Sequence, residues 1–371
     1  MMQRRVFLVI GTRPEAIKMA PVIRACRADN RVEPIVCFTG QHREMLQQVA
    51  DYFGLEAQVN LDLMVPNQTL AGLTSRCISQ LDEAINEVKP DCVVAQGDTT
   101  TVMASSLVAF YQGIDFVHVE AGLRSGDLLS PWPEELNRRI AGLTTRLHCA
   151  PTNWARDNLL REGVPAKNIE VTGNTVIDAL LWTLQREKRA DSPWHEKYGW
   201  LKERRMVLIT GHRRENFGEG MQQVCTAIRN LAASFTDVAF VYPVHLNPRV
   251  RKTVDQELRG LENVYLVEPA PYPEFVWLMD RSALIISDSG GVQEEAPSLK
   301  RPVLVTRNNT ERPEGVDAGA VELVGTKADK VVERASALLS DAAEYASFQI
   351  DSSPYGDGES AQRIIDRIAS L

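Results

Sequence analysis

The stretch that decides the fold is VIGTRPEAIKMAPVI, residues 9–23 of a chain of 371 residues. An apolar run typical of a β-strand ends here in Gly-Thr-Arg-Pro, and a basic amphipathic segment follows at once. Pro14 suits the first position of a helix, because its missing N–H would have no intrahelical partner there. The stretch therefore predicts a strand that turns directly into a helix, with the cations Arg13 and Lys18 near the turn.

The same alternation continues along the whole chain. Short Val/Ile-rich runs alternate with longer segments of helical period, which indicates βαβ units and parallel, doubly wound sheets. About six runs in each half predict two Rossmann-like domains. The runs are 6–10, 34–38, 92–96, 116–120, 147–150 and 169–171, then 206–210, 238–242, 264–267, 284–287, 303–306 and 321–324.

We therefore expect an α/β fold of two Rossmann-like domains whose parallel sheets face a central cleft. The N-terminal domain is placed at residues 1–172 and the C-terminal domain at 173–357. A helix at about 358–371 is expected to pack back on the first domain. The charged tract 186–205 lacks a clean helical period and indicates the boundary region.

The composition narrows the class of protein. Apolar residues make up 44% and charged residues 24%, as in soluble globular enzymes, and the net charge of −8 argues against non-specific binding to nucleic acid or membrane surfaces. The apolar run 6–10 is too short for a signal-peptide core, and nothing approaches the ~18 apolar residues of a membrane span. The six cysteines contain no C-x-x-C pair and predict buried thiols in a reducing cytosol, so we expect a cytoplasmic protein.

Ligands of open α/β sheets bind beyond the carboxyl ends of the strands, so each strand end is a candidate site wall. In SDSGGVQEE (287–295), glycines let the backbone approach a ligand, and free N–H groups with the helix dipole attract phosphate. Glu295, one turn further on, is placed to accept both hydroxyls of a ribose. The alternative is a tight turn with a Ser or Asp cap. At the other turn, Arg13 is suited to bidentate contacts with a phosphate, although the nearby Glu15 would repel an anion. An equal alternative is that Arg13 and Lys18 are an ordinary basic pair on the surface.

Other strand ends supply acids and bases. Asp98 follows a turn glycine and could instead cap a helix. Glu134 enters a helix after Pro-Trp-Pro and could instead favour the helix N-terminus. Glu120 is harder to explain structurally, because a buried carboxylate without a partner is costly. His212 follows a glycine at a strand end beside arginines, which suits general acid–base work, and His245 stands at the next strand end.

Several kinds of chemistry lack their motifs. No G-x-G-x-x-G follows a strand, which disfavours a tightly held NAD. No zinc-ligand spacing and no Asp-x-Asp pair occurs, so we expect no metal, and no G-x-S-x-G elbow is present. We expect no cofactor.

The motifs together resemble the non-hydrolysing, bacterial type of UDP-N-acetylglucosamine 2-epimerase. The likeness runs from residue 6 to about residue 358. It implies the GT-B architecture, with 173–357 as the nucleotide-binding domain. The motifs, in family order, are GTRPEAIKMAP, QHREML, QGDTTT, HVEAGLRSGD, SPWPEELNRR, VTGNTVIDAL, TGHRRENFG, YPVHLNP, SDSGGVQEEAPSL and TERPEG.

The resemblance implies reversible epimerisation at C2, by elimination of UDP to a 2-acetamidoglucal and re-addition of UDP, and it implies a homodimer. It assigns catalysis to Asp98, Glu120, Glu134 and His212, with the acid and the base left open. It assigns substrate binding to Arg13, Lys18, Phe275, Ser289, Gly290, Gly291, Glu295 and Arg312. Gln41, His42 and His245, with Glu134, match parts of an activator site for a second UDP-N-acetylglucosamine.

Three alternatives stay open. A GT-B glycosyltransferase would share the fold and the nucleotide site but transfer the sugar to an acceptor. A hydrolysing relative would release free N-acetylmannosamine and UDP. A regulator that binds a nucleotide sugar would have lost catalysis. The presence of the candidate carboxylates and of His212 argues against this alternative.

Overall fold

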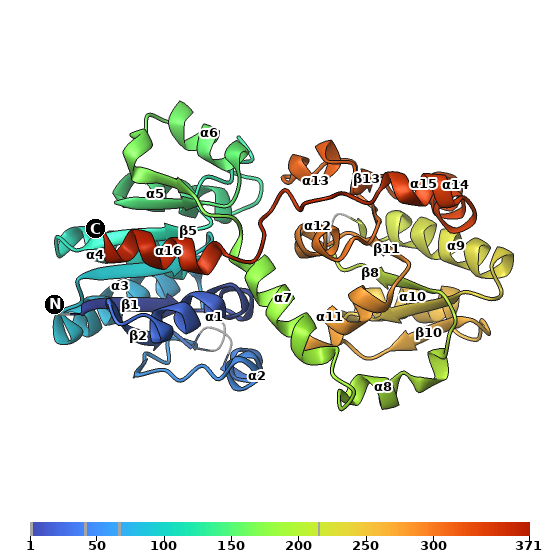
Figure 1. Cartoon of the computed structure of the whole chain (residues 1–371), viewed down its shortest axis with the longest axis horizontal. Coiled ribbons are helices and arrows are strands. Elements are labelled where there is room, and N and C mark those ends of the chain that lie inside the picture. The colour runs from blue at the N-terminus through green and yellow to red at the C-terminus, as the bar shows by residue number, and fades with distance from the viewer. Residues whose placement is uncertain (1–2, 41–42, 66–67, 214–215) are drawn as a thin grey trace. The chain divides into compact units, whose positions relative to one another are not determined.

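The computed structural model describes residues 3–40, 43–65, 68–213 and 216–371, without the side chains of 43–45. The chain folds into two compact units (Figure 1): unit 1 is Met1–Ala179 with Tyr355–Leu371, and unit 2 is Leu180–Pro354. The expected boundary after residue 172 falls just beyond β7 (Ile169–Val171), whereas this division falls inside α7 (Thr175–Glu187).

Unit 1 is built on a parallel sheet of seven strands in the order β3-β2-β1-β4-β5-β6-β7. The apolar runs predict every strand except β3, whose two residues at the sheet edge form no run. From Val6 to Ile10 every residue of β1 is buried, as expected for a strand covered on both faces. The strands of this sheet, besides β7, are β1 (Arg4–Ile10), β2 (Val32–Phe38), β3 (Val59–Asn60), β4 (Cys92–Gln96), β5 (Asp115–Val119) and β6 (Leu147–Ala150).

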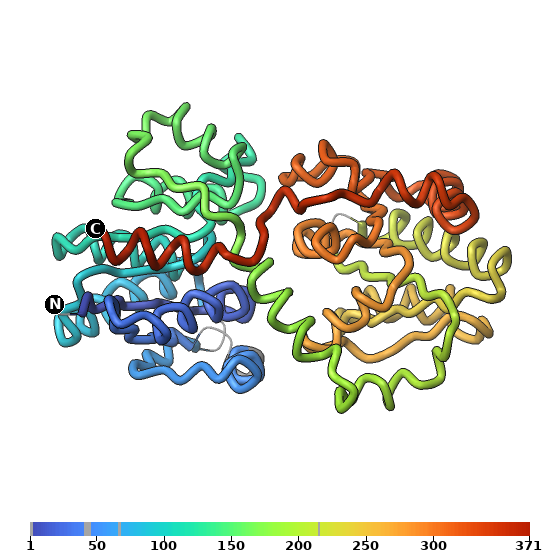
Figure 2. Tube along the Cα trace, viewed as in Figure 1, coloured from blue at the N-terminus to red at the C-terminus, as the bar shows by residue number. Residues whose placement is uncertain are grey.

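The helices of unit 1 cover this sheet. α3 (Leu70–Val88) packs on α4 (Thr100–Tyr111), and α4 packs on α5 (Glu134–Thr144). α1 (Arg13–Ala28) packs on α2 (Arg43–Phe53) and on the C-terminal α16 (Ser360–Ala369), which Figure 2 shows returning to unit 1. The prediction that the C-terminal helix packs back on the first domain is therefore confirmed. Unit 1 also contains α6 (Asn153–Arg161) and the start of α7.

Specific contacts hold the returning chain. The Asp178 carboxylate accepts a hydrogen bond from the Ala361 backbone N–H at 2.8 Å, at the start of α16, and Asn174 N–H donates to the Tyr355 carbonyl at 2.7 Å. Gly173 has a φ of +87°, and a Cβ there would lie 2.6 Å from the Ser360 hydroxyl. The crossing therefore requires glycine at this position.

Unit 2 repeats the plan with a six-stranded parallel sheet in the order β10-β9-β8-β11-β12-β13. Val207 and Ile209 of β8 pack with α9, α10 and α14, whereas Met206 and Leu208 pack with α7, α11 and α12. Both sheets with their helices confirm the predicted α/β class. The strands are β8 (Met206–Thr210), β9 (Ala239–Pro243), β10 (Val264–Val267), β11 (Leu284–Ser287), β12 (Val303–Val305) and β13 (Val321–Leu323). The helices are α8 (Pro193–Lys197), α9 (Glu219–Ser234), α10 (Pro248–Leu258), α11 (Tyr272–Arg281), α12 (Gly290–Glu295), α13 (Pro313–Asp317), α14 (Ala328–Ser340) and α15 (Ala342–Ser347).

The charged tract 186–205 belongs to unit 2 and is not a linker. Tyr198 and Leu201 are buried in its core. The Tyr198 hydroxyl donates to the buried Glu274 carboxylate at 2.5 Å, and its ring stacks on Trp277 at 5.4 Å between centroids. Aromatic anchors among many charged residues leave no periodic apolar pattern, which is why the tract resembles a boundary in the sequence.

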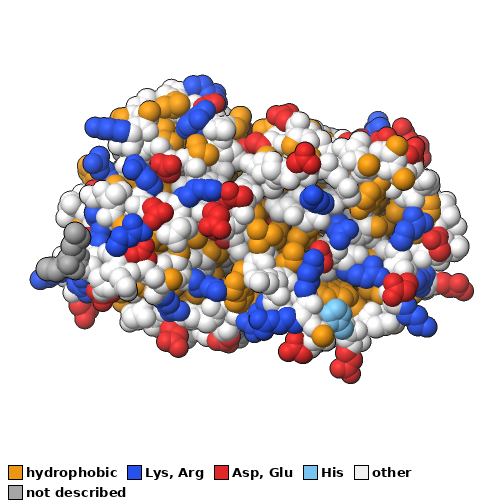
Figure 3. All heavy atoms as spheres, in the orientation of Figure 1, with side chains coloured by type: hydrophobic (Ala, Val, Ile, Leu, Met, Phe, Trp, Pro, Cys, Tyr) orange, Lys and Arg blue, Asp and Glu red, His pale blue; other side chains and the backbone are white. Residues whose placement is uncertain are grey.

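The surface carries both signs of charge. On the face drawn in Figure 3, basic and acidic side chains are interspersed over both units. Among the helices of the described residues, none is long and apolar enough to cross a membrane.

Two histidines lie side by side inside the sheet of unit 1. His118 of β5 and His148 of β6 are paired in register, and both are buried. Burial lowers the pKa of His118 to about 4 and that of His148 to about 3. Both are therefore neutral at pH 7, and His118 Nε2 lies 2.6 Å from the Gly97 carbonyl, which fixes the proton on that nitrogen.

These histidines should make the fold sensitive to acid. In the unfolded chain a histidine binds a proton below about pH 6.5, whereas in the folded protein these two bind one only near pH 4 and pH 3. The stability that each neutral histidine contributes is therefore present above pH 6.5 and is lost as the pH falls. Each histidine should lower the free energy of unfolding by about 2 kcal/mol when the pH falls from 7 to 5. Buried Glu15, with a pKa raised to about 7, acts in the opposite direction. His148→Leu should therefore reduce the pH dependence of urea unfolding, and Glu15→Gln should steepen it; an unchanged slope in both variants would contradict the assignment.

Candidate functional site

The predicted site residues gather at the carboxyl ends of the two sheets. All strands of each sheet are parallel, so their carboxyl ends share one edge. In unit 1 the neighbouring strands β1, β4 and β5 end at Ile10, Gln96 and Val119, directly before the predicted motifs. In unit 2 the neighbours β8 and β11 do the same. The strand order thus brings together residues that are far apart in the sequence.

The first turn, between β1 and α1, is closed by its own side chains. Thr12 and Glu15 form a capping box, and Glu15 Oε2 accepts from the N–H groups of Gly11 at 2.5 Å and Thr12 at 3.2 Å. Burial raises the pKa of Glu15 to about 7, although these N–H groups oppose the rise. The backbone donors that a phosphate would need are therefore already occupied in this turn.

The two cations of the opening stretch have different surroundings. Arg13 is exposed and, among the residues described, makes no hydrogen bond or ion pair. Lys18 Nζ lies 2.5 Å from Glu120 Oε2, so its charge faces a carboxylate. Arg13 is thus available to an anion, while Lys18 compensates Glu120.

Glu120 directly follows β5 in an unusual backbone conformation. Its φ is +64°, a left-handed region that costs energy for a residue with a Cβ. The side chain is 7% exposed and accepts from Gln96 Nε2 at 3.0 Å as well as from Lys18. These two partners compensate the charge of the buried carboxylate, as the sequence predicts for this position.

Asp98 is held by α5 and does not cap α4. Thr99 is the N-cap of α4, with its hydroxyl accepting from Val102 N–H, so the capping alternative for Asp98 is wrong. Asp98 Oδ2 instead accepts from Arg138 Nη2 at 2.5 Å, and its carbonyl accepts from Asn137. The sequence gives no sign of this pairing, because it depends on how α5 packs.

Glu134 is the first residue of α5 and is partly buried. Within the described part of the chain its carboxylate makes no hydrogen bond or ion pair. The next residue, Glu135, is fully buried and takes the structural role: it pairs with Arg138 at 3.3 Å and Arg139 at 3.1 Å. Glu134 is thereby left as an uncommitted carboxylate at a helix N-terminus, which is compatible with both interpretations of the sequence.

In unit 2, His212 follows β8 and contacts a carboxylate that the sequence does not single out. Asp288, directly after β11, is 1% exposed and accepts from the N–H groups of His212 at 3.0 Å and Arg213 at 2.9 Å. His212 Nδ1 lies 3.4 Å from Asp288 Oδ1. The SDSGG motif contains Asp288, but only the adjacency of β8 and β11 reveals its partner.

His245, after β9, lies against His212. The two imidazole rings stack with their centroids 5.5 Å apart, and His245 Nδ1 accepts from Asn247 N–H at 3.1 Å. The other predicted activator residues, Gln41 and His42, lie outside the described residues.

The glycine turn after β11 keeps its donors free. Ser289 is the N-cap of α12 but makes no side-chain cap. In the described residues the N–H groups of Gly290 and Gly291 have no hydrogen-bond partner, as is usual for the first turn of a helix. This turn is therefore open to an anion where the β1–α1 turn is closed.

Arg312 lies over the same turn. A Cβ on Gly290 would come within 2.7 Å of Arg312 Nη1, so a side chain there would have to displace the guanidinium. The guanidinium also contacts Glu294 and Glu311, each at 2.5 Å. Burial would raise the pKa of Glu311, but Arg312, Arg307 and Arg213 lower it to about 2.

Two predicted nucleotide contacts lie on and beside α11. Glu295, 6% exposed in α12, accepts from the Tyr272 hydroxyl at 2.8 Å. Phe275 lies three residues after Tyr272, on the same face of α11, and is partly buried against the core. The Tyr272–Glu295 bond thus ties the helix that carries Phe275 to the one that begins at the glycine turn.

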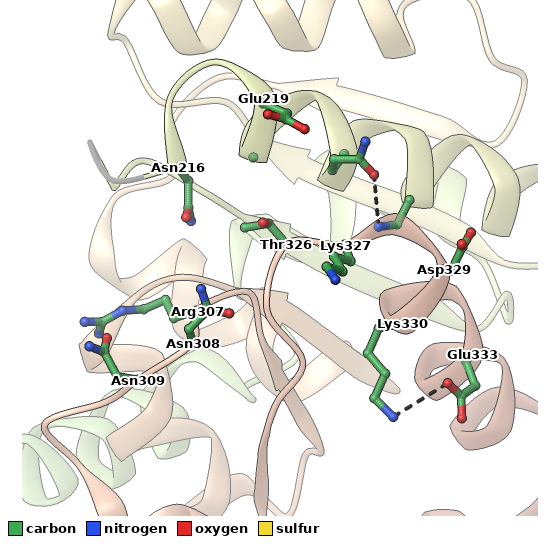
Figure 4. Close-up of a pocket in the computed structure, with 13 residues that line it drawn as sticks. Asn216, Glu219, Arg307, Asn308, Asn309, Thr326, Lys327, Asp329, Lys330 and Glu333 are labelled. Atoms are coloured by element: carbon green, nitrogen blue, oxygen red, sulfur yellow. Dashed lines mark hydrogen bonds and ion pairs between the residues drawn. The ribbon is translucent and has the colours of Figure 1, made fainter.

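A cavity of about 860 Å³ opens beside the His212 loop (Figure 4). It lies between the start of α9, residues 307–309 and residues 326–333, and basic and acidic side chains are mixed in its lining, with Lys330 3.6 Å from Glu333. None of the predicted site residues lines it. No group of three or more His, Cys, Asp and Glu in the described residues is arranged to hold a metal ion.

Comparison with known proteins agrees with this arrangement. The family model for UDP-N-acetylglucosamine 2-epimerase matches residues 24–369. The UDP-N-acetylglucosamine 2-epimerase of Salmonella typhimurium is 50% identical over 370 residues, covering 99% of this chain and 98% of the relative.

Solved structures agree as well. The crystal structure of UDP-GlcNAc 2-epimerase from Neisseria meningitidis bound to UDP-GlcNAc is similar with a TM-score of 0.93, at 45% identity, and covers 99% of this chain and 100% of its own. The S. aureus MnaA–UDP co-structure gives a TM-score of 0.89 at 43% identity and covers 99% and 96%. The family model and the identity over almost the whole length agree with the motifs at the strand ends: the chain belongs to the UDP-N-acetylglucosamine 2-epimerase family.

Proposed function

We propose that this chain interconverts UDP-N-acetylglucosamine and UDP-N-acetylmannosamine, with unit 2 binding the UDP moiety and unit 1 acting on the sugar. The proposal depends mainly on a difference in backbone hydrogen bonding between the turns after β1, β8 and β11. Internal carboxylates occupy the backbone donors after β1 and β8, whereas the Gly290 and Gly291 N–H groups after β11 are unoccupied in the described residues. A diphosphate binds where such donors are free and a cation is near, and Arg312 is near.

The proposed positions of the ribose and the uracil follow from that of the diphosphate. Glu295 would accept the ribose hydroxyls, and Phe275 would pack by the uracil. The Tyr272–Glu295 bond supports this pair, because it fixes the carboxylate relative to α11. Arg13, exposed and without an ion pair among the described residues, would contact the diphosphate, and Lys18 would contribute through its pair with Glu120.

The reaction that fits these groups is elimination and re-addition. The C2 proton is not next to a carbonyl and is a poor acid. A base removes it while the C1–O bond breaks, so that UDP leaves and a C1=C2 double bond forms; re-addition of UDP at C1 with a proton on the opposite face of C2 gives the epimer. No electrons are gained or lost overall, and the route needs no redox cofactor or metal.

Each residue has a role in this scheme. Asp98, Glu120 and Glu134 serve the sugar as acid and base, and His212 stabilises or protonates the departing diphosphate. The first two carboxylates are held by cations, Arg138 and Lys18, and Glu134 is not held in this way within the described structure. This difference in surroundings suits carboxylates with different tasks.

Proton NMR of UDP-N-acetylglucosamine incubated with the protein alone tests the function. We expect UDP-N-acetylmannosamine at a stable equilibrium. Free N-acetylmannosamine with UDP would indicate hydrolysis, and no reaction until an acceptor is added would indicate a glycosyltransferase. Binding without any reaction would leave a regulator.

Solvent exchange tests the mechanism. In heavy water the product should carry deuterium at C2, because the proton that returns is not the one removed. Mass spectrometry and NMR of the C2 position measure this, and EDTA should leave the rate unchanged. Complete retention of the original hydrogen would rule out elimination and favour a hydride route.

The division of labour predicts a pattern among variants. His212→Ala should lower turnover roughly a hundred- to a thousandfold, the ~2.7–4 kcal/mol of a donor to developing charge. Asp98→Asn and Glu120→Gln should cripple turnover but keep UDP affinity, whereas Arg13→Ala should weaken UDP binding itself.

Calorimetric titration of UDP and steady-state rates measure both quantities, with circular dichroism to check folding. Glu83→Gln, an exposed carboxylate on α3, is the matched control. Near wild-type turnover of Asp98→Asn and Glu120→Gln would show that these carboxylates are structural.

We further propose that the protein is a homodimer. Large apolar side chains are exposed on the adjacent helices α4 and α5: Phe110 is 62%, Tyr111 72% and Leu143 86% exposed. Such side chains on neighbouring helices are typical of a protein–protein interface.

We also propose that the protein acts in the cytoplasm. The six cysteines are free and buried, which fits a reducing compartment. There the product would feed the synthesis of cell-surface polysaccharide.

A charge in this surface should separate the subunits. Leu143→Glu should convert the dimer to a monomer, because association would bury the new carboxylate. Light scattering after size exclusion measures the mass, with Leu160→Glu on α6 as the control for an exposed leucine elsewhere on unit 1. A dimer that tolerates Leu143→Glu would place the interface on another surface.

A further inference from the structure

We propose that Asp288 is a positioning residue for His212: it anchors the loop that carries the imidazole and holds Nδ1, so that Nε2 meets the leaving diphosphate. The inference rests on the proposed function, because it explains how the histidine of that scheme is kept ready. It concerns a carboxylate that touches no substrate in the scheme and that acts through another residue.

The loop is fastened to Asp288 at several points. The carboxylate accepts from the backbone N–H groups of His212 and Arg213 at 3.0 and 2.9 Å, and from Asn216 Nδ2 at 3.2 Å. Asn216 Nδ2 also donates to the Thr306 carbonyl, just after β12, at 3.2 Å. One buried side chain thus ties the loop after β8 to β11, and through Asn216 to β12.

A purely structural clamp does not need a full charge. Asp288 is 1% exposed, and in the described residues no Lys or Arg lies within ion-pair distance of it; the only ionisable partner is the His212 ring, with Nδ1 3.4 Å from Oδ1. Burying a carboxylate without a cation is costly even when N–H groups compensate it. The cost is understandable if the charge is needed when His212 becomes an imidazolium.

The contact also decides which nitrogen does the chemistry. A carboxylate only accepts hydrogen bonds, so its position opposite Nδ1 favours the tautomer with the proton on Nδ1. The lone pair is then on Nε2, which takes a proton from solvent before the reaction. The imidazolium gives this proton to the departing phosphate oxygen as the C1–O bond breaks, and Asp288 stabilises the charged ring until then. Two neighbouring side chains in the described residues do not replace this role: His245 stacks on the face of the ring, and Arg213 is directed to Glu311 at 3.4 Å.

Asp288→Asn tests the proposal, because the amide keeps the size and one acceptor but loses the charge. The equivalent change in a Ser-His-Asp triad costs about 10⁴-fold in turnover. We expect at least a tenfold fall in kcat, with KM and the affinity for UDP nearly unchanged. Glu187→Gln is the matched control: it is a buried carboxylate of unit 2 that accepts from Trp194 Nε1 at 2.7 Å and does not contact His212.

A double variant separates positioning from general stability. If Asp288 acts through His212, Asp288→Asn combined with His212→Ala should be no slower than His212→Ala alone. Multiplied losses would overturn the proposal, because they would mean that Asp288 acts independently of the ring.

Nitrogen-15 NMR of the His212 ring gives a readout independent of activity, and its wild-type part needs no variant. The wild-type protein should show the proton on Nδ1, and Asp288→Asn should shift the population toward Nε2–H. A wild-type ring protonated on Nε2 would overturn the inference even if the protein is an epimerase. A protein with the expected tautomer but no epimerase activity would overturn the proposed function and leave the pair intact.

Discussion

The structure depends on how the backbone N–H groups at the strand ends are satisfied. A parallel strand that runs into a turn or a helix leaves several donors without a partner, and a buried donor must be paired or meet a ligand. After β1 the partner is Glu15, and after β8 it is Asp288. After β11 the described structure provides no such partner for Gly290 and Gly291. The same constraint therefore closes two turns and leaves open the third, where we propose that the diphosphate binds.

Much of the fold follows from the sequence because its strands are buried on both faces. Such strands are nearly continuous apolar runs, and the runs ending at Ile10, Gln96 and Ser287 give the strand ends correctly. The two-residue β3 and the helical tract around Tyr198 are different. The first is too short for a pattern, and in the second aromatic anchors are spread among charges, so its packing in unit 2 is decided by tertiary contacts with α11.

The candidate site residues can be selected from the sequence for a related reason. Ligands of open α/β sheets bind at the carboxyl edge, so polar residues directly after an apolar run, such as His212 and Glu120, are candidates. Their partners in the structure cannot be predicted in this way. The pairs Lys18–Glu120, Arg138–Asp98 and Asp288–His212 each join segments far apart in the chain, and they form only because of the strand order β1-β4-β5 and β8-β11. A single sequence contains the residues but not that order.

The pairing also has an electrostatic consequence for the proposed reaction. Carboxylates that act on a sugar must share a site with a diphosphate, and two uncompensated anions at close range repel strongly where water is excluded. Lys18 on Glu120 and Arg138 on Asp98 bring the local charge of each pair to zero, although the chain as a whole carries −8. Arg13, exposed at the same edge of unit 1, adds a positive charge that offsets Glu134, which is unpaired within the described residues. A chain with a net charge of −8 can in this way offer a diphosphate a proposed site at the strand ends, because two of the three carboxylates there each carry a paired cation.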